Sequence, residues 1–272
     1  MKLVDTNEIA GHVNDADAFH FPFHLPGDIP EWMLQLGMTK YVLIEIFVAF
    51  VMLLLFGLLA VKIRGGKPVR GRFWNMLEMM LLYIRDNVVR PSIGHKETAD
   101  KFLPYIWTLF FFVLGCNLMG LIPCMGSPTG SLSLTAVLAL FTFCIGTCAG
   151  MMKYGPVGYW IGQIPKVDVH PALAMIIKPM LFVIEVFGLL VKHSVLAIRL
   201  LANMFAGHTV VAVVMAFISG TAALGAIWYP VAIGSVGFCI CMYMLELLVA
   251  FIQAYIISFL SALFIGMAIH QH

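Results

Sequence analysis

The sequence predicts an all-α polytopic membrane protein with five transmembrane crossings, one interfacial amphipathic helix, and a final hairpin of two long, strongly tilted helices. Hydrophobic residues make up 61% of the 272 residues and charged residues only 11%, against about 25% charged residues in soluble domains. Residues 102–152 contain no Asp, Glu, Lys, Arg or His, and this range is long enough for two spanning helices and a turn. The net charge of +2 gives no sign of a nucleic-acid partner.

A polar arm, residues 1–40, precedes the first predicted span at residues 41–63. The arm carries acidic side chains at Asp5, Glu8, Asp15, Asp17, Asp28 and Glu31, and basic ones only at Lys2 and Lys40. Basic residues follow the span directly, at Lys62, Arg64, Lys67, Arg70 and Arg72. Because positive charge marks the cytoplasmic end of a span, we expect the arm to lie outside. His20 and His24 could bind a metal, but the proline between them disfavours a helical pair, so a solvated or lid-like arm is favoured.

Residues 73–90 are predicted to form the interfacial helix. A polar stripe with a nearly helical period runs through them at Asn75, Glu78, Arg85 and Asp86, and apolar residues fill the remainder. Charges confined to one face indicate a helix that lies in the membrane interface and does not cross it. We expect Pro91 and Gly94 to break this helix.

The charges of the later loops predict the remaining crossings. The uncharged hairpin at residues 102–152 is followed by a loop with Lys153, Lys166 and Lys178, which is punctuated by Pro156, Pro165, Pro171 and Pro179. This loop is expected inside and the uncharged turn at residues 219–225 outside. The pattern therefore predicts a single membrane domain, residues 41–272, with the N-terminus outside and the C-terminus in the cytoplasm.

The last two apolar segments, residues 172–218 and 224–269, are too long for upright crossings. The 40 residues from Pro179 to Ile218 span roughly 60 Å as a helix, about twice the thickness of the hydrocarbon core. Each segment must break into two helices or tilt strongly, and the lack of a polar connector favours tilt. Pro230 could kink the start of the last helix, and Gly234, Ser235 and Gly237 would permit close helix approach.

Arg199 is the most informative single residue, because no other Asp, Glu, Lys or Arg follows it until Glu246. An arginine at membrane depth costs at least roughly 2.5–3.5 kcal/mol. It cannot escape that cost by losing its proton, since the guanidinium pKa lies above about 12. With Asn203 and His208 near it in the sequence, this permanent cation indicates ion or proton handling. The alternative is a structural arginine that pairs with a carboxylate to fasten two helices.

The other polar residues of the long helices recur at helical spacing. Glu185, Lys192 and Arg199 are each seven residues apart, which places them on one stripe of a helix, and Asn203 lies one turn beyond. This shared face favours the ion-handling interpretation of Arg199 over the structural one.

Glu246 and Gln253 are also seven residues apart, on the last helix. A buried glutamate needs a partner, and His208, which falls about half a revolution from Arg199, is the natural candidate. A His–carboxylate pair titrates where protons are exchanged at ordinary pH. The alternative is an ion pair that only fastens the two helices.

The six cysteines lie in apolar segments, at Cys116, Cys124, Cys144, Cys148, Cys239 and Cys241. Cys144 and Cys148 are one turn apart and could bind a metal, but no His or second close pair accompanies them, so small-residue packing is favoured. We expect no metal and no cofactor. The sequence has no GxxxxGKS/T phosphate-binding loop, so the chain is not expected to make ATP by itself.

Several motifs lie along the chain, and the most specific is Ile198-Arg-Leu-Leu-Ala-Asn-Met-Phe-Ala-Gly-His208. Others are Arg70-Gly-Arg-Phe-Trp-Asn75 with Glu78, Tyr83-Ile-Arg-Asp-Asn87, Asn117-Leu-Met-Gly-Leu-Ile-Pro123, residues 128–140, and Ala250-Phe-Ile-Gln-Ala-Tyr255. Together they resemble subunit a of the F-type ATP synthases of bacteria. The resemblance covers the chain after roughly residue 40.

The resemblance implies a proton-translocating stator channel subunit, with two offset half-channels pressed against a rotating ring of c subunits. It implies a non-catalytic role in the complex and a multi-pass position in the cell inner membrane. The implied partners are the c-subunit ring, the b-subunit peripheral stalk, the rest of the ATP synthase and the lipid bilayer, and protons are the only implied small-molecule substrate. The lack of further carboxylates near Arg199 favours protons over sodium.

The resemblance also implies roles for individual residues. Arg199 resembles the essential arginine that faces the ring carboxylate, Asn203 its neighbour, and Gln253 the polar residue opposite it. His208 and Glu246 occupy positions where family members often carry Glu and His respectively, so the pair is exchanged here, and both are expected in the outer half-channel. The candidate inner half-channel residues are Glu185, Lys192 and His193. Gly120 stands where some members carry Asp, which weakens a channel-lining role for the hairpin at residues 102–152.

Two other classes of membrane protein compete with this interpretation. A stand-alone secondary ion transporter or channel would need inverted repeats and broken helices around a midplane site, and the sequence has no internal repeat. A membrane subunit of a redox complex would need paired haem ligands, and His193 and His208 have no matched partners in the sequence.

Overall fold

The computed structural model describes residues 39–63, 71–122, 128–162, 171–221, 225 and 228–270. All regular elements in these ranges are helical. Five helices are long and apolar enough to cross a membrane: Lys40–Ile63, Lys96–Gly120, Leu132–Tyr154, Ile177–Arg199 and Trp228–Ile269. The predicted all-α polytopic fold with five crossings is confirmed. Most of the N-terminal arm, with His20 and His24, lies outside the described residues.

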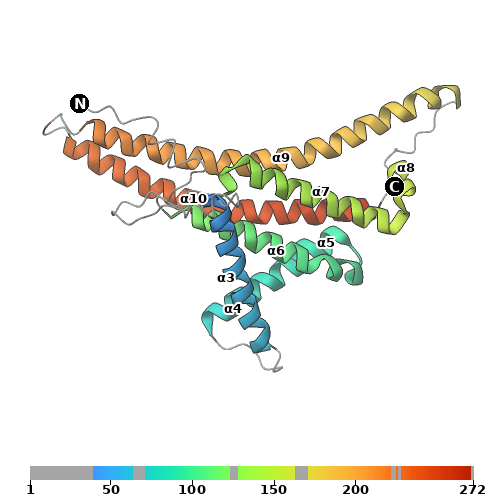
Figure 1. Cartoon of the computed structure of the whole chain (residues 1–272), viewed down its shortest axis with the longest axis horizontal. Helices are drawn as coiled ribbons and strands as arrows, with labels where there is room; N and C mark the ends of the chain where they lie inside the picture. Colours follow the sequence, from blue (N-terminus) through green and yellow to red (C-terminus); the bar gives the residue numbers. More distant parts are fainter. Residues whose placement is uncertain are drawn as a thin grey trace. The chain divides into compact units, whose positions relative to one another are not determined.

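The helices follow one another along the chain in the order shown by the colours of Figure 1. Their bounds are α3 Lys40–Ile63, α4 Arg72–Tyr83, η1 Ile84–Val89, α5 Arg90–Ile93, α6 Lys96–Gly120, η2 Pro128–Gly130, α7 Leu132–Tyr154, α8 Pro156–Gly162, α9 Pro171–Gly220 and α10 Trp228–Ile269. The contacts cluster into two compact units. The first comprises Met1–Lys67, Phe111–Thr135 and Arg199–Ala254, and the second comprises Pro68–Phe110, Ala136–Ile198 and Tyr255–His272.

In the first unit, α3 packs closely against α6. A Cβ added to Gly115 of α6 would lie 2.7 Å from Cγ1 of Val48, so only glycine allows this approach. The rings of Phe56 and Phe111 meet edge to face, with centroids 4.8 Å apart. Small residues at such points let helices approach within van der Waals range, which stabilises helix pairs in lipid.

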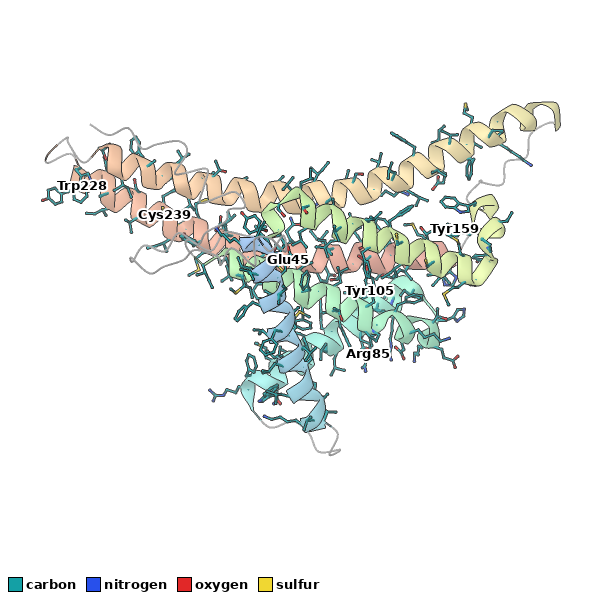
Figure 2. All side chains as sticks on the ribbon, in the orientation of Figure 1. Glu45, Arg85, Tyr105, Tyr159, Trp228 and Cys239 are labelled. Carbon is teal, nitrogen blue, oxygen red and sulfur yellow. The ribbon has the colours of Figure 1, made fainter. Side chains whose placement is uncertain are left out.

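In the second unit, α7 and α8 pack against the end of α10. A Cβ at Gly150 would overlap the ring of Tyr159 and lie 3.1 Å from the carbonyl oxygen of Ala268. The Tyr105 hydroxyl lies 3.0 Å from Thr142 Oγ1 and joins α6 to α7 (Figure 2, in which Tyr105 and Tyr159 are labelled). Hydrogen bonds between buried hydroxyls are a common link between membrane helices.

The interfacial helix is longer than predicted and is not broken by Pro91. Helix α4 continues into the π-helix η1 and then into α5, which has a proline at its first turn and ends before Gly94, where φ is 88°. The Arg90 N–H bonds to the carbonyl of Arg85, five residues back. A wider π turn relieves the clash that a proline causes with the preceding turn. Gly94 alone therefore ends the helix, because φ in that region strongly favours glycine.

The loop predicted after α7 is shorter than expected. Lys153 lies in the last turn of α7 and Pro156 begins α8. Helix α9 begins at Pro171 and runs through Pro179, so neither proline nor Lys178 belongs to a loop. The first turn of a helix has free N–H positions and accommodates Pro171. Pro165 and Lys166 lie outside the described residues.

The two long helices are each continuous, α9 over 50 residues and α10 over 42. This excludes the alternative in which either segment breaks into two helices; their tilt in a membrane stays a prediction. Pro230 lies in the first turn of α10, where a missing N–H costs nothing. Within the described part of this chain, a Cβ at Gly234 or Gly237 would meet nothing within 4 Å, so the close helix approach expected there stays a prediction.

Candidate functional site

Arg199 is exposed on α9, in the first unit. Ion pairs in the second unit join Arg85, Asp86, Arg90 and Asp100, and Arg199 takes part in none of them. In the part of the chain that the structure describes, no carboxylate pairs with the Arg199 guanidinium. The described contacts therefore give no support to a structural arginine that fastens two helices.

Helix α10 buries four polar side chains, Glu246, Gln253, Ser258 and Ser261, and the first two share one face within the first unit. Glu246 and Gln253 are each only 8% exposed. Among the described residues, neither Glu246 Oε2 nor Gln253 Oε1 has a hydrogen-bond partner. Burying a polar group without a hydrogen bond costs free energy, so such groups are kept where they serve a function.

Helix α9 approaches Glu246 closely at Gly207. A Cβ added to Gly207 would overlap Oε1 of Glu246 and lie 3.1 Å from its Cγ. The carboxylate therefore rests against bare backbone of α9, one residue before His208. His208 and Asn203 belong to α9, but their side chains lie outside the described part. The pairing of His208 with Glu246 stays a prediction.

A second contact fixes the same stretch of α10 against α6. Asn117 Nδ2 donates a hydrogen bond of 3.3 Å to the carbonyl of Ala250, which lies between Glu246 and Gln253. The hydroxyl of Thr129 donates to Asn117 Oδ1 at 2.8 Å. Asn117 and Thr129 are fully buried, so both bonds form away from water. From the sequence, Asn117 stood out only as part of a motif. An amide within an otherwise uncharged span could have identified it as a residue that bonds to another helix.

The ends of α9 and α10 also meet near the turn between them. Trp228 Nε1, at the start of α10, donates to the carbonyl of Ile218 near the end of α9 at 3.2 Å. Together with the contact at Gly207, this bond aligns the last part of α9 with the first part of α10 inside the first unit, as Figure 1 shows. The predicted hairpin of two long helices is present there.

The candidate inner half-channel residues lie on α9 within the second unit. Glu185 is half-buried and Lys192 is exposed, whereas the His193 side chain is outside the described part. The described contacts do not bring Glu185 and Lys192 together.

Two charged residues of α3 were missed by the sequence analysis. Lys40, assigned there to the polar arm, is the first residue of α3 and is fully buried. Its Nζ lies 5.7 Å from the centroid of the Tyr41 ring, a cation–π distance. Glu45 is half-buried one turn further along. A charged residue inside an apolar run is itself a signal of function or pairing, and this signal was available in the sequence.

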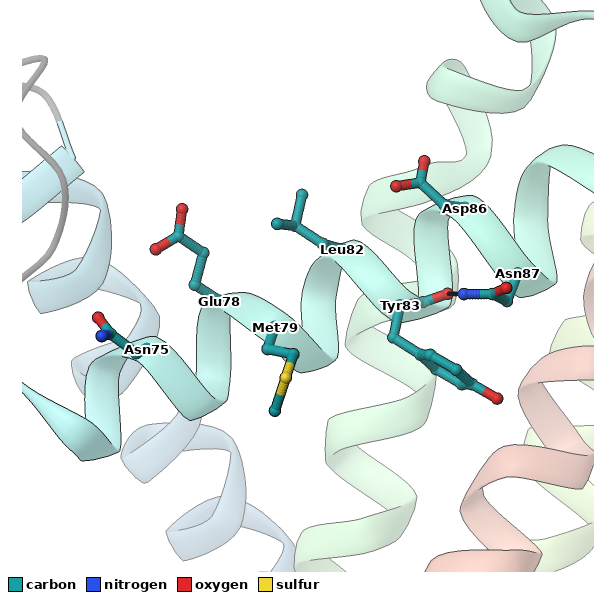
Figure 3. A pocket seen from close by; sticks show the side chains of 7 residues that line it. All are labelled: Asn75, Glu78, Met79, Leu82, Tyr83, Asp86 and Asn87. Carbon is teal, nitrogen blue, oxygen red and sulfur yellow. Dashed lines mark hydrogen bonds between the residues drawn. The ribbon is translucent and has the colours of Figure 1, made fainter.

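The polar face of the interfacial helix forms a shallow groove of about 410 Å³ (Figure 3). It is lined by Asn75, Glu78, Met79, Leu82, Tyr83, Asp86 and Asn87. Hydrogen bonds of 2.9 and 3.1 Å from Arg85 hold the pKa of Asp86 below its ordinary value. The same bonds raise the pKa of Arg85. Both groups are exposed, so water screens their attraction and its contribution to stability is small.

In the described ranges, no group of three or more His, Cys, Asp or Glu side chains could hold a metal ion. Cys144 and Cys148 are both exposed on α7, so the packing role favoured from the sequence does not hold within this chain.

Five helices long and apolar enough to cross a membrane, with ionisable and amide side chains along the last two, define a polytopic membrane protein. The chain belongs to the ATP synthase A chain family, whose sequence profile matches residues 42–266. It is accordingly a non-catalytic subunit of the membrane sector, with the rest of an ATP synthase complex as its partner. The resemblance inferred from the motifs is confirmed.

Relatives share more than a third of the residues over almost the whole chain. ATP synthase subunit a of Chloroherpeton thalassium is 36% identical over 95% of this chain and 75% of its own length. The subunit a of Anaeromyxobacter sp. is 36% identical over 99% of this chain and 64% of its own length. The ATP synthase subunit a of Pelodictyon phaeoclathratiforme is 39% identical over 96% of this chain and 75% of its own length.

Proposed function

We propose that the chain is the proton-translocating stator channel of its ATP synthase, with α9 and α10 facing a rotating ring of c subunits. One observation carries the proposal. Glu246 and Gln253 are buried on one face of α10 with oxygens that lack a described partner, in the same compact unit as the exposed cation Arg199. Such costly groups at membrane depth are typical of ion pathways.

Arg199 acts as the fixed cation of the stator. A ring carboxylate must be ionised opposite the stator and protonated when it enters lipid. A guanidinium cannot lose its proton, so it keeps the carboxylate ionised beside it and bars direct leakage between two aqueous half-channels. Asn203, one turn further on α9, and Gln253 on α10 provide polar neighbours on either side. Membership of the ATP synthase A chain family supports this assignment.

The outer half-channel runs past His208 and Glu246, and the inner one past Glu185, Lys192 and His193. An imidazole and a carboxylate together exchange protons near ordinary pH. The close approach of Gly207 to Glu246 supports the outer assignment, because it brings the backbone beside His208 to that carboxylate. Protons are the transported ion, and a b-subunit stalk holds the stator against the ring in the cell inner membrane.

The experiment is substitution of Arg199 in the complete ATP synthase. Arg199→Ala abolishes ATP synthesis and ATP-driven proton pumping, measured by quenching of a pH-sensitive dye in inverted vesicles, while the subunit stays inserted. Arg199→Lys also fails, because an ammonium in lipid can lose its proton and has no planar fork. Ile198→Ala is the control, since Ile198 is exposed beside Arg199 and carries no charge. Near-normal coupled synthesis by Arg199→Lys would refute the role.

A stand-alone transporter is the second candidate, and it predicts ion transport by the isolated chain without a c ring. No described feature favours it, because α9 and α10 are continuous and the broken helices typical of such transporters do not occur in them.

A further inference from the structure

Two histidines that lie 175 residues apart in the sequence meet in the second unit. His95 lies just before α6 and His270 just after α10. Their ring centroids are 5.9 Å apart, with the ring planes tilted by 42°. Both residues are exposed. We propose that His95 and His270 together bind a divalent transition-metal ion of the Zn²⁺ class, which clamps the end of α10 to the turn between α5 and α6.

The hydrogen bonding of His270 suits a metal ligand. Its Nε2 lies 2.9 Å from the carbonyl oxygen of Ile93. A carbonyl oxygen can only accept, so Nε2 carries the hydrogen and Nδ1 keeps a free lone pair. Metal-binding histidines almost always donate their other ring N–H to a carbonyl or carboxylate, which fixes the tautomer and raises the basicity of the ligand. Ile93 therefore holds His270 in the form that binds metal.

The spacing of the two rings is close to that of a shared ion. Zn–N bonds are about 2.0–2.1 Å, so two imidazoles on one tetrahedral ion have centroids about 5 Å apart. The rings of His95 and His270 have centroids 5.9 Å apart. A small side-chain rotation, which exposed histidines can make, would bring them to the separation that a shared ion requires. Imidazole nitrogens suit Zn²⁺, Cu²⁺ and Ni²⁺, whereas Mg²⁺ and Ca²⁺ prefer oxygen ligands. Water completes the coordination, so we expect weak, exchangeable binding.

The backbone that carries both histidines is held in place. Gly266 of α10 packs directly against Ser92, and a Cβ at Gly266 would overlap the Ser92 carbonyl oxygen. A Cβ at Gly94 would lie 3.3 Å from His270 Nε2. Lys153 Nζ and the Tyr154 hydroxyl both donate to the carbonyl of Ile269, at 2.9 and 2.7 Å. A site built on restrained elements loses little conformational entropy when it binds an ion.

Further charges lie around the same turn. Arg90 of α5 bonds to Asp100 of α6 at 3.3 Å, which ties these two elements together. The Lys153 ammonium beside Ile269 disfavours a cation, which is a further reason to expect weak binding. Four candidate spans lie between His95 and His270, an even number, so both histidines face the same aqueous side whichever side that is.

The test uses the complete ATP synthase reconstituted in lipid nanodiscs and Zn²⁺ alone as the probe. Binding is measured by competition with a fluorescent zinc chelator, in wild type and in the variants His95→Gln and His270→Gln. A glutamine amide at position 270 can still donate to the carbonyl of Ile93 but offers no imidazole nitrogen. We expect one exchangeable Zn²⁺ per complex, bound more than tenfold more weakly in either variant. Loss of a residue that only hydrogen-bonds a metal ligand already lowers metal affinity about 10- to 100-fold.

Lys96→Gln is the matched control, because Lys96 is exposed, neighbours His95 and ligates nothing. A second readout is electron paramagnetic resonance of bound Cu²⁺, which should show coupling to two imidazole nitrogens in wild type and to one in each variant. Zinc should also slow hydrogen exchange at the backbone N–H of His270, which bonds to the carbonyl of Gly266. Equal zinc affinity in wild type and both glutamine variants would overturn the proposal, as would a copper signal from a single imidazole.

Discussion

At the level of single residues, Gly207 has its effect through the side chain it lacks. The Glu246 carboxylate occupies the space that the Cβ of any other residue type at position 207 would need. Bare backbone at this point lets an ionisable group of α10 lie directly against α9. Small residues are used in this way wherever two membrane helices must approach closely.

We expect Gly207→Ala to abolish most proton transport while the subunit still assembles. The added methyl group must displace Glu246 Oε1, and this moves the carboxylate away from the α9 backbone. Overpacking of this kind costs about 1–3 kcal/mol and is relieved by movement of the neighbouring side chain. Proton pumping in inverted vesicles and the amount of assembled complex are the two measurements.

Gly188→Ala is the control for this substitution, because Gly188 lies on the same helix and a Cβ there meets nothing within 4 Å. It should pump normally. Equal activity of the two alanine variants would contradict a positioning role for Gly207.

We expect the effects of His208 and Glu246 substitutions to be non-additive, because loss of either residue already breaks a shared relay. The exchange His208→Glu with Glu246→His should restore more pumping than either single change. It keeps one acid and one imidazole, whereas each single change leaves two like groups together. The measurement is a double-mutant cycle on pumping rates. Strictly additive effects would show that the two residues act separately.

At the level of elements, α10 owes its position against α6 to one amide. Asn117 is buried, donates to the backbone of α10 and accepts from Thr129 of η2. The bonded carbonyl, Ala250, lies four residues after Glu246 and three before Gln253. The bond therefore fixes the rotation of the helix face that carries both functional residues.

We expect Asn117→Ala to destabilise the subunit by about 1–3 kcal/mol, because the two buried hydrogen bonds of Asn117, to the Ala250 carbonyl and from the Thr129 hydroxyl, are lost. Thermal unfolding of the solubilised complex measures the loss, and pumping should fall with it. Thr108→Val is the control, since the Thr108 hydroxyl bonds only to the Pro104 carbonyl of its own helix. An unchanged unfolding temperature in Asn117→Ala would argue against this bond.

Element types were predicted better than element ends. The apolar runs of α3, α6, α7, α9 and α10 exceed the length needed to span a membrane, so their existence could be predicted from composition. The prolines misled, because Pro91, Pro171 and Pro179 were treated as breaks. Pro171 lies in a first turn and Pro91 follows a π turn, where a proline loses no essential hydrogen bond. Pro179 lies inside α9, which continues through it.

At the level of the whole molecule, the asymmetry of loop charges predicts the orientation. An epitope tag at the N-terminus should be cleaved by protease in right-side-out vesicles, and one at the C-terminus only in inverted vesicles. The reason is the cluster of basic residues that follows α3, which is retained on the cytoplasmic side. Cleavage of both tags from the same side would contradict an odd number of crossings.

The sequence by itself determined the class of protein, the five spanning segments and the family, and it predicts a central role for Arg199. Each of these follows from composition or from a short continuous motif, and none of them depends on which helices pack together. Tertiary structure alone decided that Gly207 lies against Glu246, that Asn117 reaches Ala250, and that His95 meets His270. These contacts join residues from 39 to 175 positions apart, and packing between helices, which no local pattern encodes, brings them together.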